Sequence, residues 1–375
     1  MQKFARLFAA LIVLALFASA CGGGDDDADT AGEETTTTTT EAETTTTEAE
    51  TTTTESTTTT TEAPDLGPLN PLNGVPIGDD DPVTHAAVVV KVSNNDTTAR
   101  AALIGLDRAD LVYEERIESE ATRFAAVFHS DLPEEVGSVR SGRTSDIDIV
   151  SNLNRPVFAY WGSNDGVAAQ IRQADNEGLL VRVDAATGGS EFRRISGFRA
   201  PNNGVADVSA LVDRAEEGEP PAPVFDFSNN IVDIGAPSPG VRVGARQDAI
   251  FVWDEDEGGY LRFHDVGQQT FRHQTRDDVQ IAPANVVVLT TTYLPSQIDR
   301  SSVDAVTVGS GDAVVYANGF RVEGEWTREF PRDPYTLTTP DGDVIGLSPG
   351  QTWVSLTPAG TAVEVSSNEA NSLKG

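Results

Sequence analysis

The stretch from Gly137 to Ser145 contains the residues best suited to bind a charged ligand. Arg140, Ser141 and Arg143 lie close together in it, beside glycines at 137 and 142. Two guanidinium groups and a hydroxyl match the planar, bidentate hydrogen bonding of a carboxylate or a phosphate. Glycine permits backbone conformations that other residues avoid, so the loop can curl and direct both arginines inward. We therefore predict an anion pocket here; pairing of these arginines with local carboxylates is the alternative.

Other polar residues are expected around this pocket. Arg123 belongs to a preceding strand, and Arg199 and Asn203 lie in a stretch that can form an opposing loop. Lys91 lies in a β-branched run, where a place on the solvent face of an edge strand is expected, and a place in a polar cleft would make it functional. The pocket would then contain up to four arginines and an amide. The predicted anion-binding residues are Arg140, Ser141, Arg143, Arg123, Arg199, Asn203 and Lys91.

Two adjacent carboxylates, Glu114 and Glu115, end a predicted strand. Side chains alternate along a strand, so only one of the two can face the arginines. We expect Glu114 to be the internal counter-ion, and a catalytic role of either glutamate as acid or base is the alternative. A second carboxyl group roughly 5 to 10 Å away across an open cleft would favour hydrolysis. A salt bridge to an arginine would favour binding.

The sequence offers no other familiar catalytic pattern. It has no Gly-x-Ser-x-Gly elbow, no His-Glu-x-x-His and no Walker loop. Its single cysteine, Cys21, excludes an intramolecular disulfide and a thiolate metal cluster. His264 and His273 lack the spacing of metal ligands. We therefore expect no metal and no cofactor, and we lean towards a protein that is not an enzyme.

The N-terminus predicts export and lipidation. Residues 1–20 have the order of a signal peptide: basic residues, an apolar run from Leu7 to Ala18, and small residues before Cys21. Cys21 with the glycines after it resembles a lipobox, so Cys21 is the expected lipidation residue. Two acyl chains on a cysteine suffice for stable anchoring. We expect a lipid-anchored protein on the extracytoplasmic face of the cell membrane.

Residues 21–68 form the expected disordered tether between this anchor and the folded part. Clusters of threonine alternate with glutamate, and such a segment cannot bury enough apolar surface to fold. The whole chain has 59 acidic and 26 basic residues and a formal net charge of -33. This charge repels nucleic acid, which we exclude as a partner. The expected partners are the membrane, through the lipid, and a cell-wall polymer or another envelope protein.

Two folded domains are expected beyond the tether. In residues 69–218 strand and helix patterns alternate, which is typical of an α/β domain with a mixed sheet and helices. A linker at 219–224 separates it from a predominantly β domain at 225–366, and 367–375 is expected to be a disordered tail. The β domain is indicated by three turn signals with strand patterns beside them, at Gly258-Gly259, at Asn318-Gly319 and at Asp341-Gly342 before Val344 to Leu347.

Several segments, in this order, resemble the YerB-type lipoproteins over about residues 69–356. The segments are Val90-Lys91-Val92-Ser93-Asn94, Ala109 to Glu115, Thr122-Arg123-Phe124, Gly137 to Arg143, Phe158-Ala159-Tyr160 and Pro349 to Trp353. This chain departs from the family pattern at Ala200-Pro201-Asn202-Asn203, where the family usually has histidine as the third residue, and at Ala101, where it usually has proline. The resemblance implies an envelope-facing lipoprotein with two domains, and it implies no reaction.

The leading functional hypothesis is a lipid-anchored envelope protein with a non-enzymatic binding or scaffolding role and an arginine-lined pocket for an anion. A hydrolase of envelope glycan or peptide that uses Glu114 or Glu115 is the first alternative. A solute-binding receptor is the second, and it would need a deep cleft lined by aromatic residues, for which Tyr160 and Trp161 are the candidates.

Overall fold

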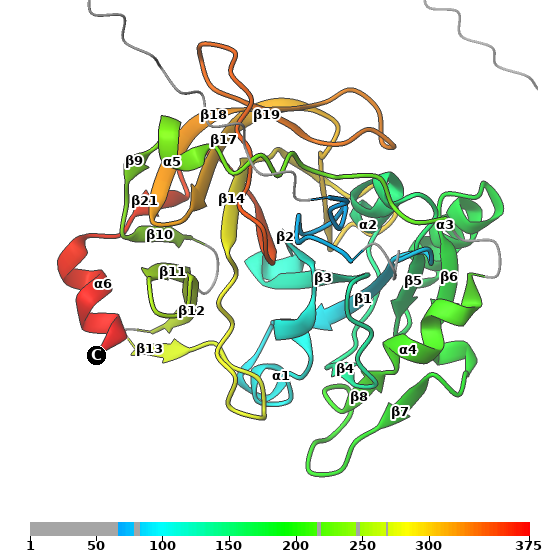
Figure 1. Ribbon diagram of the computed structural model, residues 1–375. Helices are drawn as coiled ribbons and strands as arrows, with labels where there is room; N and C mark the ends of the chain where they lie inside the picture. The colour runs from blue at the N-terminus through cyan, green and yellow to red at the C-terminus, as the bar shows by residue number, and fades with distance from the viewer. Residues whose placement is uncertain (1–66, 79–82, 216–218, 245–247, 268) are drawn as a thin grey trace, which may run out of the picture. The chain divides into compact units, whose positions relative to one another are not determined.

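The computed structural model describes residues 67–78, 83–215, 219–244, 248–267 and 269–375, all within one unit of the chain. The signal peptide, Cys21 and nearly all of the tether lie outside the described residues. The main element is a mixed sheet of eleven strands, to which both predicted domains contribute (Figure 1). Its strands, in spatial order, are β19 (Thr336–Thr338), β18 (Phe320–Arg328), β17 (Gly309–Ala317), β14 (Asn285–Thr290), β20 (Thr352–Thr357), β2 (Leu111–Arg116), β3 (Thr122–Phe128), β1 (Val88–Ser93), β5 (Val157–Tyr160) and β6 (Val181–Asp184), with β9 (Ala236–Pro237) beside β18.

The two regions of the sequence meet at β20. This strand lies between β2 and β14 and runs parallel to both, so that Thr352 is paired with Leu111 on one side and with Asn285 on the other. The pairing continues to Glu114, which is opposite Ser355. The central strands are therefore held together by hydrogen bonds between segments far apart in the sequence.

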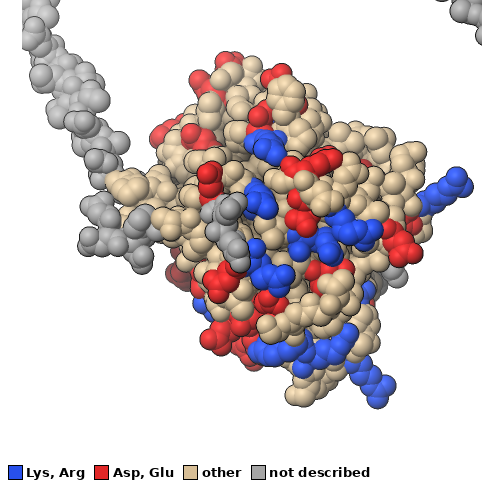
Figure 2. All heavy atoms as spheres, turned by 90° about the vertical axis from the view of Figure 1, so that its right-hand side faces the viewer, with Lys and Arg blue, Asp and Glu red and all other residues tan. Residues whose placement is uncertain are grey.

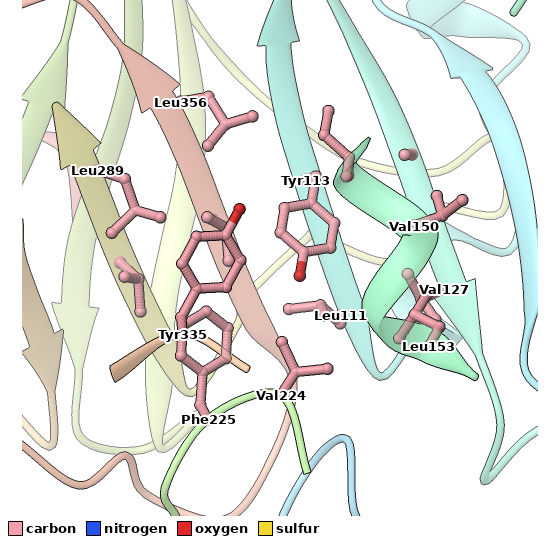
Figure 3. Close-up of a cluster of buried hydrophobic side chains, with 14 of the residues drawn as sticks. Leu111, Tyr113, Val127, Val150, Leu153, Val224, Phe225, Leu289, Tyr335 and Leu356 are labelled. Atoms are coloured by element: carbon pink, nitrogen blue, oxygen red, sulfur yellow. The ribbon is translucent and has the colours of Figure 1, made fainter. Parts of the chain in front are cut away.

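One face of the large sheet is covered by helices and by the chain around Val224. The helices on the N-terminal side are α2 (Ser145–Val150) and α3 (Asp165–Asn176). Figure 3 shows how Tyr113 and Leu111 of β2 point into this core beside Val150, with Phe225 and Tyr335 in it too. The last two rings stack with their centroids 5.5 Å apart. The alternation of apolar residues along β2 places every second side chain here.

The other face packs against a second, antiparallel sheet. Its strands, in spatial order, are β13 (Gln269–Arg272), β12 (Gly259–Val266), β11 (Asp248–Asp254), β10 (Gly240–Val243) and β21 (Ala362–Glu364). Phe251 and Tyr260 of this sheet share a core with Val112 and Trp353 of the large sheet. The smaller elements are α1 (Thr97–Ala101), α4 (Val208–Leu211), α5 (Ile231–Ile234), a sheet of β4 (Val136–Gly137), β8 (Gly204–Ala206) and β7 (Phe192–Arg194), and a pair of β15 (Tyr293–Pro295) with β16 (Val303–Ala305).

The C-terminal segment is a helix, which corrects the expectation of a disordered tail at 367–375. Helix α6 (Ser367–Lys374) begins after Ser366, whose hydroxyl accepts a hydrogen bond from the Glu369 amide at 3.2 Å. Ala370 is buried against the second sheet in a cluster with Ile250 and Phe263. The apolar side chains Ala370 and Leu373 were the available signal for this packing.

The expected fold class is confirmed, with helices and a mixed sheet in the N-terminal region and mostly strands in the C-terminal region. The turns at Gly258-Gly259 and Asn318-Gly319 join β11 to β12 and β17 to β18, as predicted. The third expected strand, at 344–347, is wrong. Val344 forms only an isolated bridge with Thr338, and the following residues continue as irregular chain.

Candidate anion-binding site

The loop after β4 is fixed between β1 and β5. The Arg140 amide donates to the Lys91 carbonyl, and the Arg140 carbonyl accepts from the Trp161 amide, both at 2.9 Å. The glycines serve close packing, and neither Gly137 nor Gly142 has a positive φ. A Cβ atom at Gly142 would lie 2.9 Å from the Ile171 side chain, and one at Gly137 would lie 2.6 Å from a backbone carbonyl.

Arg123 of β3 lies behind this loop and is 2% exposed. Its guanidinium donates to the Ser141 carbonyl at 2.9 Å, and its Nε has no hydrogen-bond partner. Within the described residues it forms no ion pair. Burial, followed by the neighbouring Arg143 and Arg140, lowers the pKa of Arg123 to about 9. Glu118 and Glu115 act against this lowering, so Arg123 is a buried cation near two further cations and two carboxylates, without an ion pair of its own among the described residues.

Arg140 and Arg143 complete this arginine group, by which we mean Arg123, Arg140 and Arg143. Arg143 forms a bidentate ion pair with Glu118, both oxygens lying 2.6 Å from its guanidinium. Arg140 is half-buried and donates to the Asn202 side-chain oxygen at 3.3 Å. Burial lowers the pKa of Arg140, and Arg143 lowers it further, against the opposing effect of Asp96. The group thus contains three guanidiniums, of which that of Arg143 is ion-paired with Glu118.

The opposing loop contributes a different amide from the one predicted. Asn202 links Arg140 to Asp96. Its side-chain oxygen accepts from Arg140, and its side-chain NH2 group donates to Asp96 at 3.3 Å. Asn203 instead accepts from Arg194 at 2.6 Å, and Arg199 is exposed. Neither joins the group, because adjacent loop residues point in different directions and the sequence could not tell which asparagine faces inward. The Ser141 hydroxyl donates to the Trp161 carbonyl at 3.4 Å, so it is the carbonyl of Ser141 that contacts an arginine.

Lys91 is fully buried, which corrects the expectation of a solvent-facing lysine. Its ammonium lies 2.7 Å from Glu115 and 2.6 Å from Asp146 at the start of α2. Burial raises the pKa of Asp146 to about 7, Lys91 acts against this rise and Glu115 adds to it. Lys91 is thus neutralised by carboxylates of the protein. Asp146 was not predicted; its position three residues after Arg143, whose amide it binds at 2.7 Å, was the available signal.

Glu114 lies on the opposite face of the sheet and is not the counter-ion of the arginine group. It pairs with Arg262 of β12 at 2.9 Å and accepts from the Trp353 indole at 3.0 Å. Glu115, which is opposite Arg123 in the register, is the glutamate on the arginine side. Strand alternation correctly predicted that only one of the two could face there.

Arg262 was not singled out in the sequence, although it is fully buried. Its guanidinium lies over the Trp353 ring, 4.6 Å from the centroid, and donates to His273 Nδ1 at 2.6 Å. The available signal was its position in β12. Arg262 lies two residues after the inward-facing Tyr260, and side chains two residues apart in a strand point to the same face of the sheet.

These contacts favour binding over hydrolysis at the two glutamates. Glu114 and Glu115 are buried, and each is held by a cation. Tyr160 is also fully buried, stacked on Phe158 with centroids 5.3 Å apart, so it lines no open cleft. Trp161 packs under the Arg194 guanidinium, 4.2 Å from it. The aromatic cleft expected of a solute receptor is not formed by these two residues.

Exposed arginines on the face that carries α3 and β6 differ from Arg123. Figure 2 shows them among acidic side chains. Arg214 pairs with Glu191 at 2.7 Å, and Arg193 pairs with Glu135. These two surface arginines are therefore paired with local carboxylates, unlike the buried Arg123.

The chain matches a family and a solved structure over most of its length. Residues 72–220 match the N-terminal domain, and residues 240–354 the C-terminal domain, of the family "Protein of unknown function (DUF3048)". A protein of Bacillus subtilis (strain 168) named "Putative lipoprotein YerB" is 26% identical over 298 residues, covering 76% of this chain and 86% of that protein. The crystal structure of the YerB protein from Bacillus subtilis matches with a TM-score of 0.67 and 22% identity, over 80% of this chain and 100% of that one.

The solved structure shows that the fold is shared, and the relative's name is that of a lipoprotein. Among the described residues, no helix is long and apolar enough to cross a membrane. The two matched regions are separated by residues 221–239. This chain belongs to the DUF3048 family and is a YerB-like protein.

Proposed function

We propose that this chain is a lipid-anchored extracytoplasmic protein that binds a carboxylate or phosphate group of an envelope ligand at the arginine group. The observation that carries this proposal is the state of Arg123, a buried guanidinium without an ion pair within the described part of the chain. Beside it, Arg140 likewise has a neutral partner, the Asn202 amide. Only Arg143 of the group is paired with a carboxylate.

A bound anion would supply the missing charge. Burying an unpaired charge costs several kcal/mol unless it is neutralised. A guanidinium has five donors in a planar fork, and Arg123 and Arg140 each use few of them within the protein. A carboxylate or phosphate between the two could therefore accept from both, which is the strong, charge-assisted form of the hydrogen bond.

The anchor supports a ligand of the cell envelope. Cys21 and the tether lie outside the described residues, and the lipoprotein name of the relative agrees with the lipobox pattern. A tethered domain outside the membrane meets polymers and proteins of the wall. The strongly acidic chain would repel most polyanions, so the ligand is better described as a local acidic group than as a long polyanion.

Thermal unfolding in phosphate tests this proposal on the mature chain carrying Cys21→Ser. A ligand that binds only the folded state stabilises it by about 2.7 kcal/mol at a concentration 100 times its Kd. We expect phosphate to raise the Tm of this protein more than sodium chloride of equal ionic strength does. Arg140→Gln should reduce the difference, whereas Arg108→Gln, at an exposed ion pair with Asp131, should keep it in full. Equal phosphate effects in all three proteins would contradict the proposal.

A further inference from the structure

A cavity of about 890 Å³ opens beside α1 and β13. It is lined by residues of α1, by β13 and the chain that follows it to Asp278, and by Phe198 and His264. No residue of the arginine group lines it, so this cavity is separate from the anion site of the proposed function. Its volume lies within the range of about 300 to 1000 Å³ that is typical of small-molecule sites.

The cavity wall has more cationic than anionic groups. Arg100, Arg272 and Arg276 line it, with Asp278 as the lining carboxylate. Arg276 also pairs with Glu135, and the Asp278 carboxylate accepts from the Gln274 amide at 2.8 Å. Arg272 has no ion pair within the described residues. An anion is therefore the ligand that the charge of this wall favours.

His273 adds an unused hydrogen-bond donor. It lines the cavity although it is only 1% exposed. Arginine can only donate, so His273 Nδ1 must accept the 2.6 Å hydrogen bond from Arg262. Burial, His264 and Arg262 hold the pKa of His273 well below its ordinary value, so the ring is neutral and its proton is on Nε2. That Nε2 has no acceptor within the described residues.

The same wall exposes aromatic surface. The side chain of Phe271 in β13 is 51% exposed, and Phe198, which is half-buried, also lines the cavity. An exposed phenyl ring beside arginines offers an apolar face next to cationic groups. Small-molecule sites combine these two features, since apolar contact supplies affinity and a few polar groups fix orientation.

We propose that this cavity binds a small organic anion, in which a phosphate or carboxylate contacts Arg272 and Arg100 and a ring or other apolar part lies against Phe271. His273 would donate from Nε2 to an oxygen of the same ligand. The ligand would be held by residues from both matched domains, because Arg100 belongs to the first and Phe271 and Arg272 belong to the second.

Three probes separate the two parts of this ligand: phenyl phosphate carries both, inorganic phosphate lacks the ring and phenol lacks the charge. In calorimetric titrations of the mature Cys21→Ser chain, we expect phenyl phosphate to bind at least about tenfold more tightly than either of the others. Arg272→Gln should weaken phenyl phosphate about tenfold, the loss of one charge-assisted contact. Phe271→Ala should reduce the preference for phenyl phosphate over phosphate. Both side chains are on the exposed strand β13, so both variants should fold.

Arg108→Gln, which removes the same charge elsewhere on the surface, is the matched control and should bind phenyl phosphate like the wild type. The inference is overturned if phenyl phosphate does not bind, or if Arg272→Gln and Phe271→Ala bind it unchanged. Binding that survives in both variants and is lost in Arg140→Gln would assign the anion to the arginine group instead. That result would support the proposed function and refute this one.

Discussion

Arg123 and Arg262 are both buried arginines, but their guanidinium groups have different partners. Arg262 donates to both oxygens of Glu114 and contacts two histidines and three aromatic rings. Arg123 donates to a backbone carbonyl and lies near two more arginines. The first arrangement is complete within the protein, which is typical of a structural ion pair. The second leaves donors and charge for a ligand.

The Glu114 and Arg262 pair should therefore act on stability. Removing one partner strands a buried charge, so Arg262→Met should lower the free energy of unfolding by about 3 to 5 kcal/mol. Adding Glu114→Gln to Arg262→Met should restore part of this loss, because it removes the stranded carboxylate. Urea unfolding of the two single variants and the double variant measures this coupling. Additive losses would show that the pair does not act as a unit.

Asp146 should give the protein a pH-dependent stability. Its pKa in the folded state, about 7, lies above the value near 4 of an unfolded aspartate. Between these values the folded state binds more protons than the unfolded chain, so the free energy of unfolding falls as pH rises, by up to about 1.4 kcal/mol per pH unit. Asp146→Asn should remove this slope between pH 5 and pH 7. Asp341→Asn, at an exposed turn, should follow the wild type, and an unchanged slope in Asp146→Asn would contradict the assignment.

Residue types close in sequence predicted much of the candidate site, and distant partners could not be predicted. Arg140, Arg143 and Arg123 were found because a glycine-flanked motif follows a strand. Asn202 and Arg262 were missed because their roles depend on how a loop and a second sheet pack, 62 residues from Arg140 and 148 residues from Glu114.

At the scale of elements, turn signals were reliable where both flanking strands had a sheet to join. The strands around Asn318-Gly319 extend the large sheet, whereas the chain after Asp341-Gly342 folds back as irregular structure. Helix α6 shows the opposite case. Its sequence is polar and short, yet two side chains, Ala370 and Leu373, pack on the second sheet and the cap at Ser366 fixes its start.

Two adjacent substitutions test whether α6 is part of the fold. Ala370 is 3% exposed, so Ala370→Asp should bury a charge and lower the free energy of unfolding by about 2 to 4 kcal/mol. Asn371→Asp adds the same charge one residue later, at an exposed position, and should change it by less than about 0.5 kcal/mol. Chemical denaturation measures both. Similar small effects would mean that the segment does not pack as described.

At the scale of the whole molecule, one sheet is built from both matched domains. Strand patterns predicted β2, β17 and β18 as separate segments, but nothing local indicates that β20 lies between β2 and β14. Such a pairing joins residues more than two hundred positions apart and is decided by the packing of complete surfaces. The fold class followed from the sequence, and the connection between its two parts did not.

The proposed lipid anchor also concerns the whole molecule. We expect Cys21→Ser to release the protein from the membrane fraction, because it removes the expected lipidation residue and the net charge repels anionic lipid. Gly22→Ser leaves the cysteine in place and should remain with the membrane. Fractionation of cells that express each variant measures this. A Cys21→Ser protein that stays in the membrane fraction would contradict lipid anchoring.

Observing the Arg123 side chain while an anion is added tests anion binding at the arginine group most directly. In a nuclear magnetic resonance titration of the mature Cys21→Ser chain with phosphate, we predict that the Nε–H signals of Arg123 and Arg140 shift together and saturate. The signal of Arg108, which is paired at the surface, should not follow that curve. If the Arg123 signal stays unchanged while the protein remains folded, the arginine group does not bind an anion, and the proposed function is wrong.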